Sequence, residues 1–229
     1  YRWENSSGKS GYSVACANEW KHGICYKPQI KCSDCKSRQL LPITQEVLYS
    51  HLTGQKVIGI YPLLATDQCR LLAVDFDKSD WKNCVTAFSE ACLSLNIPFL
   101  VERSRSGNGA HVWIFFSEPI AAKQARLMGA GILDKAMELY PALDFESYDR
   151  MFPNQDHMPA GGFGNLIALP LQKHARALGN STFIDSNFNA FTDPWTVLQQ
   201  TELMSSSEVN NIVNELGYNF IEQNQTDVD

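Results

Sequence analysis

The stretch Leu71-Leu72-Ala73-Val74-Asp75-Phe76-Asp77 joins an apolar run to two carboxylates. The apolar run predicts a buried β-strand. Because alternate side chains of a strand share one face, Asp75 and Asp77 are expected on the same face, about 6–7 Å apart at Cα. Two carboxylates placed in this way can hold the pair of divalent cations that promotes in-line phosphoryl transfer. The alternative is a polar strand end that enters a turn.

Apolar runs on both sides of this stretch predict the remaining elements. Strands are expected at residues 57–63, 71–76, 99–101, 112–116, 166–169 and 182–184. Helices are expected before Gly54 and at residues 79–95, 121–139 and 205–216, the last with the capping-box pattern Ser205-x-x-Glu208. Since strands and helices intermix, the fold class is α/β or α+β with a mixed sheet.

A loop rich in hydrogen-bond donors lies between two of these strands. It reads Glu102-Arg103-Ser104-Arg105-Ser106-Gly107-Asn108-Gly109-Ala110-His111. The two glycines let backbone N–H groups approach an anion closely, and the serines, arginines and histidine add donors suited to phosphate oxygens. The loop lacks the Gly-Lys-Ser/Thr ending of a P-loop and the glycine pattern of a dinucleotide fold. We interpret it as a cradle for a triphosphate, with a plain hairpin turn as the equally weighted alternative.

A third carboxylate near the pair would complete a two-cation site, because three acids balance two dications better than two. Asp156 is our choice and Asp149 the reserve. Asp149 could instead form a structural ion pair with its neighbour Arg150, and either acid could cap a loop. Spacing alone does not decide between these interpretations.

Four of the seven cysteines crowd into a twenty-residue window, as Cys16, Cys25, Cys32 and Cys35. Their spacing, with a tight Cys-x-x-Cys pair at the end, favours tetrahedral zinc bound by thiolates. Disulfides or free thiols are the alternatives, and the absence of a signal peptide disfavours disulfides. The segment has little apolar content of its own, so a metal would organise it. The other three cysteines, which have apolar neighbours, are expected in the core: Cys69, Cys84 and Cys92.

Composition and charge limit the class of protein. With 229 residues, 44% of them hydrophobic and 19% charged, the chain is not mainly disordered, collagen-like or a coiled coil. Seven basic and three acidic residues fall within 1–38, whereas 177–229 hold eight acidic residues and no basic ones. The net charge of −6 therefore does not exclude a polyanion ligand. We expect a cysteine module at 1–40, a catalytic domain at 41–200 and a helical, acidic tail at 201–229.

No apolar segment is long enough to cross a membrane, and no signal-peptide core opens the chain. We therefore expect a cytoplasmic protein without membrane contact. The chain does not begin with Met, so we expect it to be part of a longer protein.

Together these motifs resemble the archaeo-eukaryotic primase superfamily. Its marks are an apolar strand that ends in Asp-x-Asp, a later Ser-x-His element and a third acid. Asp75 and Asp77 match the first, the run from Ser106 to His111 followed by Val112-Trp113 matches the second, and Asp156 best fits the third. Further strings, among them Gly59-Ile60-Tyr61-Pro62-Leu63-Leu64 and Gly162-Phe163-Gly164-Asn165-Leu166-Ile167, are similar to primase-polymerases of CRISPR-associated and TOTE conflict systems.

The resemblance implies a fold and an activity. The fold is an N-terminal α/β unit beside a sheet like that of RNA-recognition motifs (RRM-like), with the site in the cleft between them. The activity is template-directed nucleotidyl transfer with two Mg²⁺ or Mn²⁺ ions, single-stranded DNA and nucleoside triphosphates. Helicases, nucleases or CRISPR adaptation proteins are implied as fused or associated partners. One departure is that Asp156 falls in a Pro- and Gly-rich loop, whereas the family's third acid usually ends a strand.

The resemblance also implies roles for individual residues. Asp75, Asp77 and Asp156 are the implied cation ligands, and His111 with Ser106 contacts the triphosphate. Further implied nucleotide contacts come from the loop and from a later segment: Arg103, Ser104, Arg105, Gly107, Gly109, Gln172 and Lys173.

Two other functions fit parts of the pattern. A metal-dependent nuclease would use the same acids, but it has no need of a triphosphate cradle. A non-catalytic module could bind single strands through its basic cysteine segment and stack bases on Trp3, Tyr12, Trp20 and Tyr26. Asp75 and Asp77 disfavour the module, because carboxylates that face phosphates would weaken binding.

Overall fold

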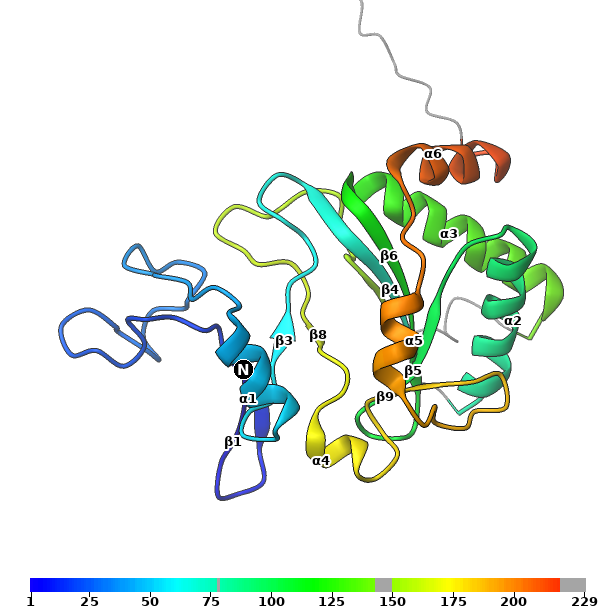
Figure 1. Ribbon diagram of the computed structural model, residues 1–229. Coiled ribbons are helices and arrows are strands. Elements are labelled where there is room, and N and C mark those ends of the chain that lie inside the picture. The colour runs from blue at the N-terminus through cyan, green and yellow to red at the C-terminus, as the bar shows by residue number, and fades with distance from the viewer. Residues whose placement is uncertain (78, 143–149, 219–229) are drawn as a thin grey trace, which may run out of the picture.

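The computed structural model describes residues 1–77, 79–142 and 150–218, and its centre is a five-stranded sheet (Figure 1). The strands lie in the order β7-β4-β6-β5-β9, and every neighbouring pair in this order is antiparallel. Their bounds are β4 Gln68–Phe76, β5 Leu100–Arg103, β6 Ala110–Ala121, β7 Arg150–Phe152 and β9 Thr182–Ile184.

The chain enters this sheet in the order β4-α2-β5-β6-α3-β7, with α2 at Trp81–Ser94 and α3 at Ala122–Leu139. The helical crossover makes β5 run parallel to β4, but β6 lies between them and is antiparallel to both. Within the described residues, all neighbouring strands of the five-stranded sheet are therefore antiparallel. The expectation of a mixed sheet was wrong. Hydrophobic patterning predicts where strands occur, but not which strands become neighbours.

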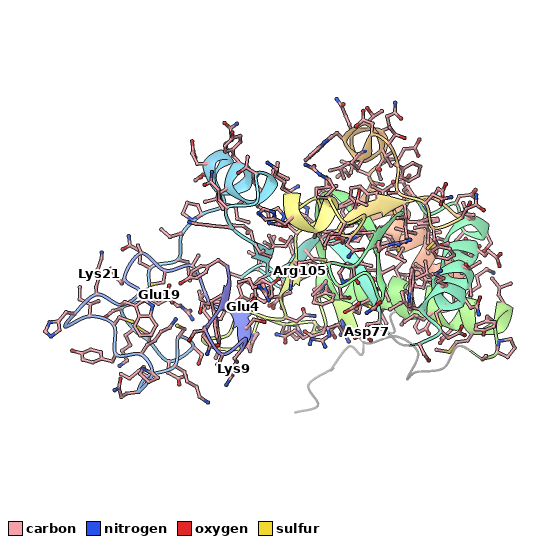
Figure 2. All side chains as sticks on the ribbon, turned by 90° about the horizontal axis from the view of Figure 1, so that it is seen from below. Glu4, Lys9, Glu19, Lys21, Asp77 and Arg105 are labelled. Carbon is pink, nitrogen blue, oxygen red and sulfur yellow. The ribbon has the colours of Figure 1, made fainter. Side chains whose placement is uncertain are left out.

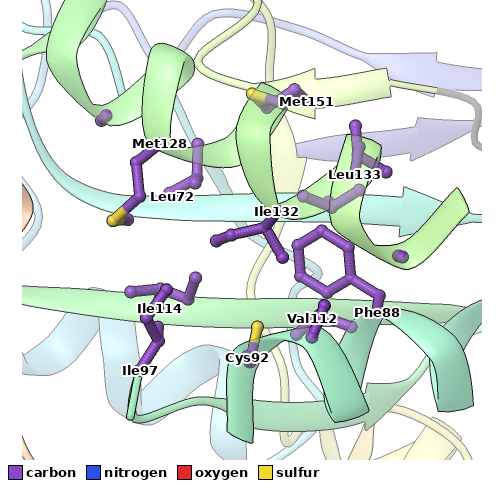
Figure 3. Close-up of a cluster of buried hydrophobic side chains, with 14 of the residues drawn as sticks. Leu72, Phe88, Cys92, Ile97, Val112, Ile114, Met128, Ile132, Leu133 and Met151 are labelled. Carbon is purple, nitrogen blue, oxygen red and sulfur yellow. The ribbon is translucent and has the colours of Figure 1, made fainter. Parts of the chain in front are cut away.

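One face of the sheet carries the main hydrophobic core, which α2 and α3 cover (Figure 3). Alternate residues of β4 and β6 point into it, as the two-residue period of a strand requires. Helix α6, Ser206–Glu215, adds Val209 and Val213 to the same core. The segment expected as a helical, acidic tail therefore contributes buried residues to this core. The buried side chains labelled in Figure 3 are Leu72, Phe88, Cys92, Ile97, Val112, Ile114, Met128, Ile132, Leu133 and Met151.

The opposite face of the sheet packs on elements from both halves of the chain through a smaller core, made of Ala73, Trp113, Phe152, Ile167, Leu171 and Phe183. The elements on this side are α1 Gln45–Leu52, β3 Gly59–Ile60, β8 Ile167–Ala168, α4 Lys173–Arg176 and α5 Pro194–Gln200 (Figure 1).

The first 44 residues extend away from the sheet (Figure 1). Strands β1, Arg2–Glu4, and β2, Ser10–Tyr12, form a hairpin that is tied to the domain by a hydrogen bond from Arg2 N to Val57 O of 2.9 Å. Turns follow up to residue 44, with one isolated bridge between Cys16 and Leu40. The segment is therefore held mainly by turns and side-chain contacts.

Several local predictions are confirmed. Ser205 and Glu208 form the expected capping box at the start of α6. Cys69, Cys84 and Cys92 are all buried, and burial raises the pKa of the Cys69 thiol to about 12.

The strand expected at 57–63 is only the two residues of β3, because it has a single two-residue partner, β8. None of the described helices combines the length and the apolar character needed to cross a bilayer.

A buried histidine joins α1 to the rest of the domain. The His51 ring is 1% exposed, accepts from Ile58 N at Nδ1 (3.0 Å) and lies 3.0 Å from Pro170 O at Nε2. These partners fix the neutral tautomer that carries its proton on Nε2. Burial lowers the pKa of His51 more than the backbone carbonyls raise it. The native ring is therefore neutral at a pH where the unfolded ring takes up a proton.

This arrangement predicts a loss of stability in mild acid. Because the unfolded chain binds the extra proton, the free energy of unfolding should fall as the pH drops below about 6.5. Urea titrations between pH 7.5 and 5 measure the slope. His51→Gln should be less stable at every pH but should have a shallower slope. A slope equal to that of the parent protein would contradict this role for His51.

Candidate functional site

Asp75 and His111 face each other across β4 and β6. They are direct partners in the strand register, and His111 Nε2 lies 3.4 Å from Asp75 Oδ1. The register extends this row to Arg150 on β7 and to Glu102 on β5, so four charged or titratable side chains cross one face of the sheet. The sequence distance between these residues is large, but the antiparallel pairing places them side by side.

Asp77 follows two residues after Asp75, at the end of the same strand (Figure 2). The backbone of Gly109 presses against this point, since a Cβ there would lie 2.5 Å from Phe76 O and 3.0 Å from Asp77 Cα. No larger residue fits without moving the strand end. The Asp-x-Asp element and the glycine loop are therefore in direct contact, and His111 is the second residue of β6, the strand that follows the loop.

Glu102 is the buried centre of this row. Its carboxylate is 2% exposed and accepts from three neighbours: the His111 ring at 2.9 Å, Trp113 Nε1 at 2.9 Å and Ser181 Oγ at 3.3 Å. The bond to His111 uses Nδ1, so the Nε2 edge of the ring is turned toward Asp75. A buried carboxylate with three donors is a rigid support, because any rotation leaves a donor unpaired.

The same carboxylates set the protonation of His111. Burial alone would lower the pKa of the ring, but the negative charge and hydrogen bond of Glu102, followed by the charges of Asp75 and Asp77, raise it overall. The influence of both aspartates on one ring places Asp75, Asp77 and His111 in one electrostatic cluster. A protonated His111 offers an N–H donor to an anion at the edge of the sheet.

The loop of residues 103–109 closes above this edge as a compact turn. Ser104 N donates to Gly109 O (2.9 Å), and Gly107 N donates to Ser104 O (3.0 Å). Gly107 has a φ of 82°, and the space where its Cβ would lie is filled by Asn180. The hydroxyls of Ser104 and Ser106 lie 3.0 Å apart, and Ser106 Oγ also accepts from Asn108 N. Both predicted serine contacts thus lie at the same edge as His111, and Arg105 is exposed beside them.

The comparison with known families agrees with this arrangement. Residues 1–212 match the family described as TOTE conflict system, Archaeo-Eukaryotic Primase domain. The chain belongs to this family. A search of curated proteins finds no match. The primase-domain match spans the cysteine segment, the sheet and α6 up to residue 212.

Asp156 does not join the acid pair of this primase domain. Its carboxylate accepts from Arg126 of α3, and the next two residues, His157 and Met158, bond to Asp67 at 2.9 and 2.7 Å. Asp67 precedes β4, eight residues and roughly 25 Å of strand before Asp75. Because β7 runs antiparallel to β4, the chain that leaves it moves away from the acid pair. Asp156 therefore lies away from Asp75 and Asp77 in this structure, and its role as third ligand stays a prediction from sequence.

Two further predicted nucleotide contacts are engaged elsewhere. Arg103 lies on the helix-covered face, opposite to its neighbour Glu102, and donates to Phe188 O at 2.6 Å. The Gln172 side chain caps α4 by accepting from His174 N and Ala175 N. Neither side chain points at His111 in this structure. Lys173 is the exposed first residue of α4.

Two residues of the site were not assigned a role in it from sequence. Glu102 and Arg150 reach the acid pair only through strand register, which the sequence does not display. Tyr12 of β2 was expected only as a stacking residue of a binding module; burial raises the pKa of its hydroxyl, whereas the charges of Arg105 and Arg2 oppose the rise. The charge of Arg105 in the glycine loop thus acts on Tyr12 of the N-terminal hairpin. Asp149, the reserve for the third acid, lies outside the described residues.

The four cysteines of the N-terminal segment line one small pocket and are free thiols. Cys16 Sγ accepts from Asn18 N at 3.4 Å and Gln39 N at 3.3 Å. Burial alone would lower the pKa of Lys27, but hydrogen bonds to Glu19 and Cys32 raise it. Across the described ranges, no three His, Cys, Asp or Glu side chains are arranged to hold a metal ion. The four thiols thus share a pocket, and Cys16 accepts two backbone N–H donors, but the described residues form no closed set of metal ligands.

Proposed function

We propose that this primase domain catalyses template-directed nucleotidyl transfer at the edge formed by Asp75, Asp77 and His111. The observation that carries the proposal is the direct pairing of Asp75 with His111, at 3.4 Å, beside the glycine loop. The family match and the β-α-β-β-α-β order, which is that of an RRM-like sheet, support it. Metal ions at the carboxylates would activate the attacking hydroxyl and stabilise the leaving pyrophosphate.

In this proposal, different residues of the site bind the metal ions and the phosphates. Asp75 and Asp77 supply the negative charge that attracts Mg²⁺ or Mn²⁺, since both metals prefer carboxylate oxygens. His111, oriented by Glu102, donates to a phosphate oxygen of the nucleotide. Arg105 and the loop serines add donors on the same side, and Lys173 offers a further cation. The third acid is a prediction that now rests on sequence alone. Helicase and nuclease partners also remain predictions from the resemblance.

A primer-extension assay tests the proposal. The protein is incubated with primed and unprimed single-stranded DNA, labelled nucleoside triphosphates, and Mg²⁺ or Mn²⁺. Elongated products whose sequence follows the template support nucleotidyl transfer. Shortened DNA would instead indicate a nuclease. DNA binding without elongated or shortened products would indicate a non-catalytic binding module.

We also propose that the four clustered cysteines hold a structural zinc ion, because they line a common pocket and Cys16 receives two N–H donors. Metal analysis of protein purified without added zinc should find about one zinc per chain. Replacing both Cys32 and Cys35 by Ser should remove the zinc and unfold the segment, whereas Cys92→Ala, in the sheet core, should retain it. A folded, zinc-free parent protein would overturn this proposal.

A further inference from the structure

Trp20 combines an exposed side chain with an unfavourable backbone conformation. It has a φ of 62°, the left-handed region that bulky residues rarely adopt, and 68% of its surface is exposed. Strained backbone combined with an exposed aromatic ring points to a role outside folding, since neither feature stabilises the isolated domain. Lys27 Nζ lies 5.7 Å from the ring centroid and is anchored by Glu19 at 2.7 Å. The ring is thus held in place while most of it faces solvent.

A second aromatic ring lies in the same turns. Tyr26 is 55% exposed, and its hydroxyl donates to Gly23 O at 3.2 Å, which fixes its direction. Two aliphatic neighbours, Ile24 and Ile30, are 40% and 43% exposed. We call Trp20, Ile24, Tyr26 and Ile30 the aromatic face. Such rings, held by their own turns, can stack on unpaired bases without a large entropic penalty.

The charge of the surrounding segment suits a polyanion. Residues 16–38 contain five basic and two acidic side chains, although the whole chain is acidic. Lys21, Lys31 and Lys36 are exposed. Glu19, one of the two acids, is paired with Lys27. The aromatic face therefore lies in a locally positive environment, which favours a nucleic acid over an acidic protein surface.

Two labelled basic residues, Lys9 and Arg105, lie between this segment and Asp77 in the view from below (Figure 2). Seen from below, Lys21, Lys9, Arg105 and Asp77 follow one another across the molecule (Figure 2). The acidic residues labelled along this path, Glu4 and Glu19, are neutralised by Arg2 and Lys27, each at 2.7 Å. Once these two ion pairs are counted, the labelled side chains before Asp77 carry a net positive charge. A single strand could follow it with its phosphates on the lysines and Arg105.

We propose that the aromatic face binds the single-stranded template, by stacking unpaired bases on Trp20 and Tyr26, and that the strand runs from there past Lys9 and Arg105 to the acid pair. The word template rests on the proposed function, whereas the binding of single-stranded DNA does not. Single strands are preferred to duplexes, because only unpaired bases expose both faces of their rings. Binding weakens as salt is raised, because the lysines displace counterions from the phosphates.

The test is fluorescence anisotropy with a labelled oligothymidylate of about 20 nucleotides, in buffer without nucleotide, using the whole chain. Alanine at Trp20 or Tyr26 should each weaken binding by about 5- to 150-fold, as loss of one base–aromatic stack does. Tyr49→Ala, a matched control that removes a ring 65% exposed on α1, should bind like the parent protein. Trp20→Phe should restore most of the affinity, which separates stacking from misfolding.

The outcomes separate this proposal from the previous one. Parent-like binding by the Trp20→Ala and Tyr26→Ala variants would overturn it, even where primer extension succeeds. An equal loss in Tyr49→Ala would also overturn it, because it would show a general effect of surface aromatics. Stacking-dependent binding without primer extension would retain the single-strand site and reject the polymerase.

Discussion

Replacing Asp75 and Asp77 together by Asn is expected to reduce template-dependent nucleotide incorporation by about 10³-fold or more. Asn keeps the size of each side chain but removes the charge that attracts divalent cations. The site also loses two of the three carboxylates that raise the pKa of His111. Single-turnover extension at saturating Mn²⁺ measures the loss. Circular dichroism should show an unchanged fold, because both residues lie at the partly exposed end of β4.

Asp156→Asn is the matched control for this experiment. It removes the same chemical group from a position that the sequence motif alone ranks with the other two. In the structure its carboxylate is paired with Arg126 at the far end of β4, so the variant should retain incorporation within a few fold of the parent protein. A loss as large as that of the double variant would return Asp156 to the site. Full activity in the double variant would reject the site itself.

Helices and strands could be predicted from sequence where apolar residues recur with the spacing of a helix or a strand. Strand β9 and helix α3 match their predicted ranges to within one residue, because each has an apolar face bounded by turn residues. The hairpin of β1 and β2 was missed, since three-residue strands with charged and glycine residues carry no such period. The antiparallel character of the sheet was also missed, because it depends on which strands become neighbours.

Some residues of the candidate site could be predicted from sequence, whereas others could be recognised only from the strand pairing. Asp75, Asp77, His111 and the glycine loop could be predicted because they are close in sequence to the strands that bring them together. Asp156 and Arg103 lie away from His111 because of strand geometry: Asp156 follows a strand that leads away from Asp75, and Arg103 points to the opposite face of the sheet. Glu102 and Arg150 could be recognised only once the register of β4, β5, β6 and β7 was known.

Substitution of Glu102 is expected to lower the stability of the domain strongly, because its carboxylate is buried and accepts three hydrogen bonds. Removing one partner of a buried charged cluster costs about 3–5 kcal/mol, because the remaining groups stay buried and unpaired. Glu102→Ala is therefore expected to lower the free energy of unfolding by about this amount. Glu102→Gln keeps the volume but turns an amide N–H₂ toward donors, and should cost about 2–3 kcal/mol. Urea denaturation measures both values.

A surface carboxylate supplies the control for stability. Glu90, exposed on α2, should lose less than about 0.5 kcal/mol when replaced by Gln. A Glu102→Gln variant as stable as Glu90→Gln would show that the three hydrogen bonds to Glu102 contribute little.

The same substitution separates a structural role from a positioning role. Glu102 does not face the nucleotide in the proposed arrangement, but it holds the His111 ring that does. Loss of this support should raise the nucleotide KM more than it lowers kcat, because binding geometry is affected first. His111→Ala should then have little further effect in a Glu102→Gln background, since the two residues act as one unit. Independent, multiplicative effects of the two substitutions would instead mean that Glu102 stabilises the sheet without orienting His111.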